Sequence, residues 1–173
     1  MSDDWAAEAV AALRTVGVDL GVGLPDSGVA PLLEAFEAAD GAETLTVCRE
    51  EEAVGVLAGA WVGGRRGALV CQTSGLANAL NAVGSLSVPA RLPFVGLVSR
   101  RGGLGEFNAA QVPMGYNMPA VLDAVGVRTC VVERPGAVAE RTRLAATSAF
   151  STGLPYVVLL DATVTGHKSE GGR

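Results

Sequence analysis

Three consecutive acids, Glu50, Glu51 and Glu52, open a segment rich in alanine, glycine and valine. They follow a short apolar run, residues 44–48, so the first carboxylate lies at the end of an expected strand, where α/β proteins bind ligands. The simpler interpretation is that acids in the first turn of a helix are favoured by the helix dipole. We adopt that interpretation for Glu51 and Glu52 and leave Glu50 open.

Two turns offer further polar groups. Residues 23–27, Gly-Leu-Pro-Asp-Ser, form either a ligand site or a turn in which Ser27 caps a helix and Asp26 is solvated. Residues 72–75, Gln-Thr-Ser-Gly, form a strand-to-helix turn whose free backbone N–H groups could meet an anion. The second turn has no lysine and lacks the spacing of a P-loop, which argues against a nucleoside triphosphate.

A longer polar segment, Ser99 to Gly115, has 17 residues with four glycines and one proline. A loop of that length inside a compact domain usually has a function. It carries Arg100 and Arg101, whose guanidinium groups would suit a sulfonate or phosphonate group through bidentate contacts. A solvated basic pair is the simpler interpretation.

The composition argues against several classes of protein. The net charge is −5, and the 13 lysines and arginines form no adjacent run longer than a pair, so no basic surface for nucleic acid is expected. The longest apolar stretch, residues 53–64, is about a dozen residues, short of the roughly 20 that cross a bilayer. The acidic start also lacks the basic region of a signal peptide. We therefore expect a cytoplasmic protein that binds neither nucleic acid nor membrane.

The cysteines and the one histidine limit the possible chemistry. Cys48, Cys71 and Cys130 lie in or beside apolar runs without metal-ligand spacing, and we expect buried, reduced thiols. His167 is the only histidine and lies in the polar C-terminal segment. The sequence therefore predicts no metal site in this chain, and a histidine-based triad is excluded.

Short apolar strands alternate with helical segments along the chain. The expected strands are residues 18–22, 44–48, 68–71, 94–98, 128–132 and 156–160. The expected helices are residues 5–16, 27–38, 50–62, 76–86, 119–124 and 137–150. This order predicts an α/β fold of three α/β/α layers around a mostly parallel six-stranded sheet. A length of 173 residues fits one domain, which we assign to residues 1–164, with a flexible polar tail over 165–173.

Taken together, four segments resemble the pyrimidine-binding domain of thiamine-diphosphate enzymes, and most closely the decarboxylases of sulfopyruvate and phosphonopyruvate. They read GLPDS at 23–27, REEEAVGVLAGAW at 49–61, QTSGLANALNAVGSL at 72–86 and SRRGGLGEFNAAQVPMG at 99–115. The match spans roughly residues 8–160. Its order and spacing are more specific than any one segment.

The resemblance implies a role for Glu50. In that superfamily the functional glutamate precedes a helix glycine by nine positions, as Glu50 precedes Gly59. The implied role is a hydrogen bond to the ring nitrogen of the cofactor's aminopyrimidine, which stabilises the imino tautomer that removes the thiazolium proton. A carboxyl group packed between small apolar residues and that ring would lose solvation, which favours sharing a proton with the ring.

Other positions follow from the same resemblance. The implied catalytic residues are Glu50, Ser27 and Gln111, and the implied cofactor contacts are Glu50, Pro25, Thr73, Ser74, Gly75 and Asn78. The implied substrate contacts are Asp26, Ser27, Arg100, Arg101 and Gln111. The chain departs from the family pattern at Ala77, where relatives carry a glycine before the asparagine.

The sequence contains no GDG motif, with which superfamily members hold magnesium and diphosphate in a separate domain. The resemblance therefore implies a split enzyme: a beta subunit supplies that domain with Mg²⁺, and thiamine diphosphate lies between the chains. The implied reaction is decarboxylation of a small anionic 2-oxo acid, sulfopyruvate or phosphonopyruvate, to the aldehyde. Two alternatives stay open, a split thiamine-diphosphate enzyme for an uncharged 2-oxo acid and a noncatalytic assembly or ligand-binding subunit.

Overall fold

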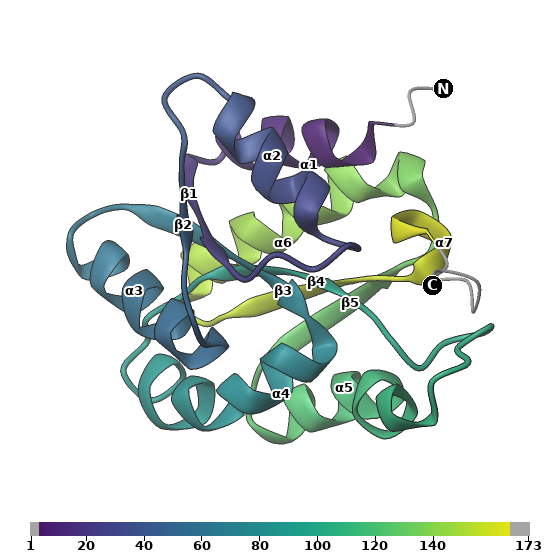
Figure 1. Ribbon diagram of the computed structural model, residues 1–173. Helices are drawn as coiled ribbons and strands as arrows, with labels where there is room; N and C mark the ends of the chain where they lie inside the picture. The colour runs from purple at the N-terminus through teal and green to yellow at the C-terminus, as the bar shows by residue number, and fades with distance from the viewer. Residues whose placement is uncertain (1–3, 167–173) are drawn as a thin grey trace.

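The computed structural model describes residues 4–166 and shows one parallel sheet covered by helices on both faces (Figure 1). The strands are β1 (Val18–Gly23), β2 (Glu43–Thr46), β3 (Arg66–Gln72), β4 (Val95–Ser99), β5 (Arg128–Val132) and β6 (Tyr156–Leu160). Their order across the sheet is β2-β1-β3-β4-β6-β5, and every neighbouring pair is parallel. The predicted three-layer α/β fold is confirmed.

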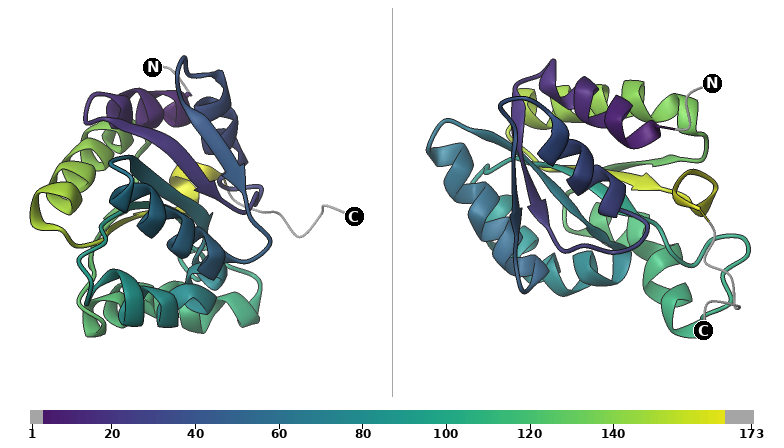
Figure 2. Two further views of the ribbon diagram at one scale, coloured as in Figure 1. Left: turned by 90° about the vertical axis from the view of Figure 1, so that its left-hand side faces the viewer. Right: turned by 45° about the horizontal axis from the view of Figure 1, so that its top comes forward.

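Two hydrophobic clusters hold the layers together. The helices are α1 (Trp5–Arg14), α2 (Ala30–Ala38), α3 (Glu50–Val62), α4 (Thr73–Ala82), α5 (Val112–Ala124), α6 (Val138–Thr152) and α7 (Ala162–Thr165). One cluster joins the sheet to α1, α2, α6 and α7, and the other joins it to α3, α4 and α5. Figures 1 and 2 show these two groups of helices on opposite faces of the sheet.

The sequence of each strand explains its place in the sheet. Strands β4 and β6 are almost entirely buried, as expected for apolar runs covered on both faces. Edge strand β2 is mostly exposed and carries threonine and glutamate, whose polar side chains suit an edge. The sheet therefore presents a rigid centre whose carboxyl ends, here called the rim, hold the polar segments.

Close packing at two glycines fixes strand β1 against its neighbours. A Cβ on Gly21 would come within 2.8 Å of the Phe36 ring, and a Cβ on Gly23 would overlap the carbonyl of Val70. Glycine is therefore needed at both positions because backbone and ring approach too closely for a side chain. The turn that leaves β1 towards the rim is held in place by this packing.

The structure departs from the expected boundaries at several elements, and most at helix α5. Helix α5 begins at Val112, seven residues before the expected Pro119, so the long loop after β4 ends earlier than predicted. Pro113 fits the first turn of α5 because backbone N–H groups there have no intrahelical acceptor. Pro119 lies inside the helix. Helix α4 starts at Thr73 and continues through a π-helical turn, Val83–Ser87.

The cysteines follow the prediction only in part. All three thiols are free, Cys71 is buried and Cys130 is partly buried, but Cys48 is exposed. Cys48 lies beyond the last residue of the exposed edge strand β2, so no layer covers it. His167 and most of the expected tail lie outside the described residues. Within 4–166, no helix is both long and apolar enough to cross a membrane.

Replacing Phe36 with alanine should destabilise the fold strongly. The ring is fully buried between α2 and the backbone of β1, and truncating it would leave a cavity beside Gly21. We expect a loss of about 3–5 kcal/mol in the free energy of unfolding, measured by urea titration and circular dichroism. Leu104→Ala, at a side chain that is 95% exposed, serves as the control with about 0.5 kcal/mol or less. Similar losses in both variants would contradict this packing.

Candidate active site

The three acids at the start of α3 have different surroundings. The Glu51 carboxylate pairs with Arg49 at 2.9 Å. The Glu52 carboxylate accepts the backbone N–H groups of Cys48 and Arg49 at 3.0 and 3.2 Å, which caps the helix. Within the described chain the Glu50 carboxylate has neither a hydrogen bond nor an ion pair. The structure therefore separates Glu50 from its two acidic neighbours, which serve the helix itself.

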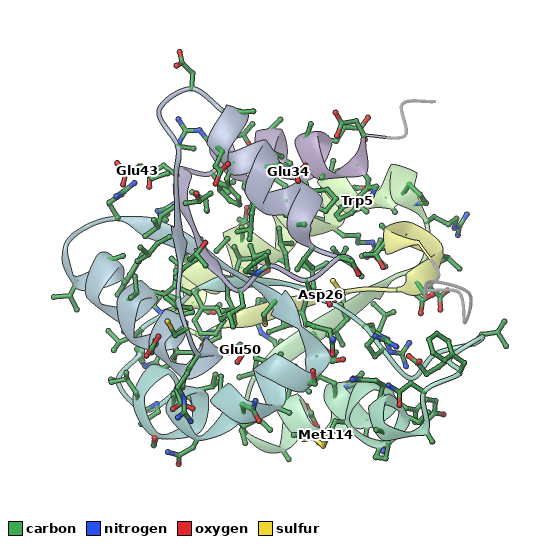
Figure 3. The ribbon with its side chains drawn as sticks, viewed as in Figure 1. Trp5, Asp26, Glu34, Glu43, Glu50 and Met114 are labelled. Carbon is green, nitrogen blue, oxygen red and sulfur yellow. The ribbon has the colours of Figure 1, made fainter. Side chains whose placement is uncertain are left out.

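The Glu50 side chain lies against the first turn of α4. A Cβ built on Gly75 would overlap the Glu50 carboxylate, so only glycine permits this contact. Below it, Cys71 is buried, and burial together with the Glu50 charge raises the pKa of the Cys71 thiol. Figure 3 shows Glu50 on the side of α3 and α4. The Glu50 carboxylate is thus partly exposed, has no partner in the described chain, and lies directly over the backbone of Gly75.

The other polar groups at the start of α4 are used within the chain. The Gln72 side chain accepts the N–H of Ser74 at 3.2 Å and its hydroxyl at 2.5 Å. The Thr73 hydroxyl, fully buried, accepts the backbone N–H of Arg101 at 3.2 Å. The structure therefore places Thr73 as a link to the loop after β4. Asn78 lies further along α4 and is exposed.

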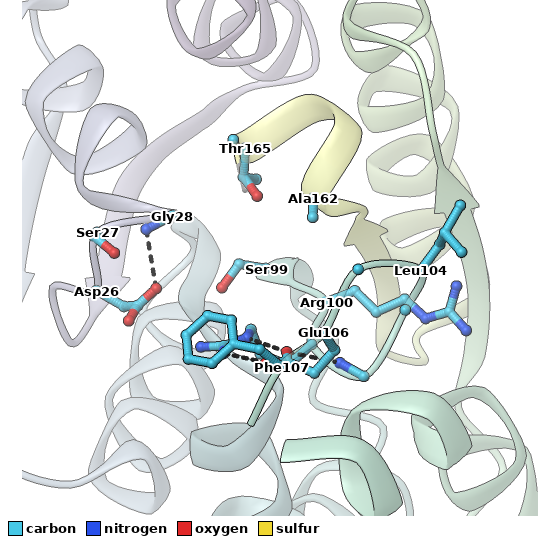
Figure 4. A pocket seen from close by; sticks show the side chains of 15 residues that line it. Asp26, Ser27, Gly28, Ser99, Arg100, Leu104, Glu106, Phe107, Ala162 and Thr165 are labelled. Carbon is cyan, nitrogen blue, oxygen red and sulfur yellow. Dashed lines mark hydrogen bonds and ion pairs between the residues drawn. The ribbon is translucent and has the colours of Figure 1, made fainter. Parts of the chain in front are cut away.

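The turn after β1 is organised by Asp26. Its carbonyl accepts the N–H groups of Val29 and Ala30 at 2.9 and 2.7 Å, and its carboxylate accepts the N–H of Gly28 at 2.9 Å (Figure 4). Helix α2 starts only at Ala30, and no side chain caps it. The possible role of Ser27 as a helix cap is therefore wrong. Ser27 is exposed, as is Pro25 before it.

A pocket of about 230 Å³ opens at the rim beside this turn (Figure 4). Its walls come from the turn after β1, from the loop after β4 and from α7. Four of the predicted site residues line it: Asp26, Ser27, Arg100 and Arg101. Glu50, Gln111 and the α4 turn are outside this lining. The structure thus groups the predicted residues into a pocket and a separate Glu50 surface, and Thr73 links the α4 turn to the pocket's loop.

Arg101 is held by a carboxylate that the sequence analysis did not select. Its Nε and Nη2 donate to the two oxygens of Glu106 at 2.6 and 2.7 Å. The Arg101 hydrogen bonds chiefly, together with backbone N–H groups, lower the pKa of Glu106 to about 2. Arg101 is therefore not part of a solvated basic pair, because two of its three guanidinium nitrogens bind Glu106 and its side chain is only 14% exposed. An acid five residues after an arginine in a glycine-rich loop is the signal that could have indicated this pair.

Arg100 points in another direction. Its guanidinium lies 3.8 Å from the Asp161 carboxylate and 5.9 Å from the centre of the Tyr116 ring. In Figure 4 it extends away from Asp26 and Ser27. Its Nε is buried and has no hydrogen-bond partner in the described chain. Each arginine of the predicted pair therefore lies beside a carboxylate of the same chain.

Two further residues bear on the site. Ser99, only 2% exposed, lines the pocket, and its hydroxyl has no partner within the described residues. Sequence reasoning missed it because a serine at a strand end carries no distinctive pattern. Gln111 closes a short 3-10 turn, Ala109–Gln111, just before α5 and is partly exposed. Residues 4–166 contain no group of three or more histidine, cysteine or acidic residues suited to a metal ion.

The chain is an α/β domain whose polar groups gather at the carboxyl ends of a parallel sheet, where such domains bind ligands. A family model described as "Thiamine pyrophosphate enzyme, N-terminal TPP binding domain" matches residues 4–102, more than half of the chain. The chain belongs to this family. A partly exposed carboxylate without a partner in the described chain has the chemistry to bind a hydrogen-bonding ring such as the aminopyrimidine of this family's cofactor.

Two individual proteins show which members of the family the chain resembles. Over 163 residues the chain is 34% identical to the sulfopyruvate decarboxylase subunit alpha of Methanococcus maripaludis, a match that covers 94% of this chain and 98% of that protein. Phosphonopyruvate decarboxylase of Streptomyces viridochromogenes is 42% identical over 106 residues, covering 61% of this chain and 27% of that protein.

A solved structure shares the fold. A 2-oxoglutarate:ferredoxin oxidoreductase from Magnetococcus marinus superposes with a TM-score of 0.78 at 15% identity, covering 95% of this chain and 29% of that one.

The stability of the chain should depend on pH through Glu106. The pKa of this carboxyl is lowered from 4.5 to about 2 in the folded chain, so its stabilising effect is fully present above its unfolded pKa and is lost as the pH falls towards 2. We expect Glu106→Gln to be less stable than the wild type at pH 7, with a difference that shrinks below about pH 4.5. Urea midpoints at a series of pH values measure this. A difference that stays constant with pH would contradict it.

Proposed function

We propose that the chain is the alpha subunit of a split thiamine-diphosphate-dependent decarboxylase that converts sulfopyruvate or phosphonopyruvate to the aldehyde and carbon dioxide. The observation that carries the proposal is Glu50, whose carboxylate has no partner among the described residues and lies over Gly75. Relatives named sulfopyruvate decarboxylase subunit alpha, matched over nearly their full length, support the reaction and the split architecture.

Glu50 would hold a proton at its carboxylate and hydrogen-bond the ring nitrogen of the cofactor's aminopyrimidine. Gly75 leaves room for the Glu50 carboxylate at the start of α4, and the backbone of the turn at Ser74 lies beside Gly75. Thiamine diphosphate supplies the nucleophilic carbon and the electron sink when it is bound. The chain contributes orientation and a fixed polar environment, which lower the barrier without any new covalent chemistry.

The pocket would receive the substrate. Asp26 and Ser27 line it from the turn after β1, and in this proposal both contact the 2-oxo acid. Gln111 lies outside the lining, and we propose that it orients the substrate from the start of α5. Arg100 and Arg101 line the same pocket, but each lies beside a carboxylate, Asp161 and Glu106 respectively. We therefore propose that the partner subunit supplies some of the positive charge that binds a charged head group. These neutralised arginines also favour a second candidate, a split enzyme for an uncharged 2-oxo acid.

The partner would be a beta subunit that carries the diphosphate-binding domain and holds Mg²⁺. Helix α3 offers the face on which we propose it docks, because Gly55 and Gly59 are both exposed and a Cβ at either would meet nothing within 4 Å. Residues four apart lie on one face of a helix, so another chain could approach the helix backbone closely there. Glu50 begins the same helix. At 3.6 residues per turn, however, Glu50 lies about 140° and 180° around the helix from Gly55 and Gly59, so in this proposal the partner also extends past the start of α3 to reach Glu50.

Glu50→Gln should abolish turnover of the assembled enzyme. The amide keeps the size of the side chain but cannot hold the transferable proton, so we expect kcat to fall by about 10²- to 10⁴-fold. Aldehyde formation from sulfopyruvate and from phosphonopyruvate is measured with the co-expressed beta subunit. Glu51→Gln, which alters the neighbouring acid paired with Arg49, is the control with near wild-type kcat. Equal activity of Glu50→Gln and wild type would favour the noncatalytic alternative.

Gly59→Leu should prevent association with the beta subunit while the alpha subunit stays folded. The added side chain projects into open space in the isolated chain, and leucine favours a helix more than glycine does. We therefore expect an unchanged or higher melting temperature together with loss of the complex in analytical ultracentrifugation. Gly136→Leu is the matched control, because a Cβ at Gly136 also meets nothing. A Gly59→Leu chain that still assembles with wild-type affinity would place the interface elsewhere.

A further inference from the structure

The Glu106 carboxylate joins several parts of the loop after β4. It accepts hydrogen bonds from Arg101 Nε and Nη2 at 2.6 and 2.7 Å and from the backbone N–H groups of Gly102 and Asn108 at 3.2 and 3.0 Å. Its side chain is only 7% exposed. An ionised, buried carboxylate with four donors is a strong local constraint, because removing it leaves those donors without an acceptor.

The two ends of this constraint reach the proposed site. On one side, the backbone N–H of Arg101 donates to Thr73, which begins α4 two residues before Gly75. On the other side, the Asn108 side chain accepts the N–H of Ala110 at 3.1 Å, and the Asn108 carbonyl accepts the N–H of Gln111 at 2.9 Å. A continuous set of hydrogen bonds therefore runs from Glu106 to the α4 turn and to Gln111.

The base of the loop is fixed against α5. A Cβ on Gly115 would overlap the backbone carbonyl of Arg101, so the helix packs directly on the loop backbone. Gly102 has a positive φ of 78°, and a Cβ there would come within 2.8 Å of the Tyr116 backbone nitrogen. Both glycines hold the loop base and the start of α5 together, which requires the residues between them to follow one path.

Hydrophobic burial does little to define that path. Leu104 at the loop tip is 95% exposed, and Phe107 is 48% exposed. Loops with few buried apolar contacts open at low free energy unless polar contacts hold them. The shape of residues 101–108, which include much of the pocket wall, therefore depends on the Glu106 carboxylate.

We propose that Glu106 is a positioning residue: it holds the pocket loop, and through Asn108 it fixes Gln111 in the orientation that the reaction requires. This inference rests on the function proposed above, because it assigns Glu106 a part in the same site. Glu106 itself touches no reacting atom in this proposal. Its effect is transmitted by the hydrogen bonds of Arg101 and Asn108, and a displacement of about 1 Å at a reacting group can cost about 10²-fold in rate.

The test combines kinetics with hydrogen exchange in the assembled enzyme. Glu106→Gln, Gln111→Ala and the double variant are compared for kcat and KM. We expect each single change to lower kcat by about 10- to 100-fold, and the double variant to be no slower than the slower single variant, because both act on the same group. Glu43→Gln is the matched control: it removes a carboxylate that pairs with Arg65 at 3.1 Å on the exposed edge of the sheet.

Amide exchange gives a readout independent of turnover. In Glu106→Gln we expect the amides of Gly102, Asn108 and Gln111 to exchange faster, while amides of the central strand β4 remain protected. Should Glu106→Gln fail to fold, Asn108→Ala removes the acceptor of the Ala110 N–H in the turn that carries Gln111, and we expect it to lower kcat and to speed exchange at Ala110.

The outcomes separate this inference from the proposed function. Multiplicative effects of Glu106→Gln and Gln111→Ala on kcat, or an unchanged kcat in Glu106→Gln, would overturn the positioning role. Unchanged exchange at Gln111 in Glu106→Gln, or at Ala110 in Asn108→Ala, would overturn it as well. A wild-type complex that decarboxylates neither substrate would instead overturn the proposed function, and the exchange measurement would still decide whether Glu106 holds Gln111.

Discussion

The contact between the Glu50 carboxylate and the backbone of Gly75 is the constraint on which the site depends. It requires α3 and α4 to begin side by side at the carboxyl ends of β2 and β3, and it requires glycine at the point of contact. The carboxylate held there is partly exposed and has no partner in the described chain, so its oxygens remain available to a ligand or another chain. The surrounding acids do not relieve it, because Glu51 and Glu52 bind Arg49 and the helix N-terminus.

The rest of the rim is nearly neutralised within the chain. Arg101 binds Glu106 in a buried bidentate pair, and Arg100 lies beside Asp161. Ion pairs of this kind fix the conformation of the loop, but they attract an anionic substrate only weakly, because each cation is offset by a nearby anion. The glycine-rich loop is thus better described as a preorganised wall than as a basic patch, and selectivity for an anionic head group requires charge from another source.

Much of the fold could be predicted from the sequence because each strand is a short apolar run separated from the next by a helical pattern. The strands β1, β5 and β6 were predicted to within one residue of their observed ends. The start of α5 was not, because Pro113 and Pro119 look like loop punctuation, although one fits a first turn and the other is tolerated inside the helix. Glu50 could be selected by its spacing from Gly59. The partner of Arg101 had only the signal of an acid five residues later, and the partner of Arg100 had none, because these contacts depend on loop conformation and on contact between distant strand ends.

The two halves of the site lie on different faces of the sheet, and this explains why a buried hydroxyl matters. Glu50 lies with α3 and α4, whereas the pocket is bounded by α7 and by the turn that enters α2. Thr73 connects them, because it begins α4 and accepts the backbone N–H of Arg101. The fully buried Thr73 can therefore contribute to a site at the rim, because its hydrogen bond holds the pocket loop in a fixed position relative to the α4 turn. This hydrogen bond is thus a direct link between the pocket loop and the α4 turn across a closely packed sheet.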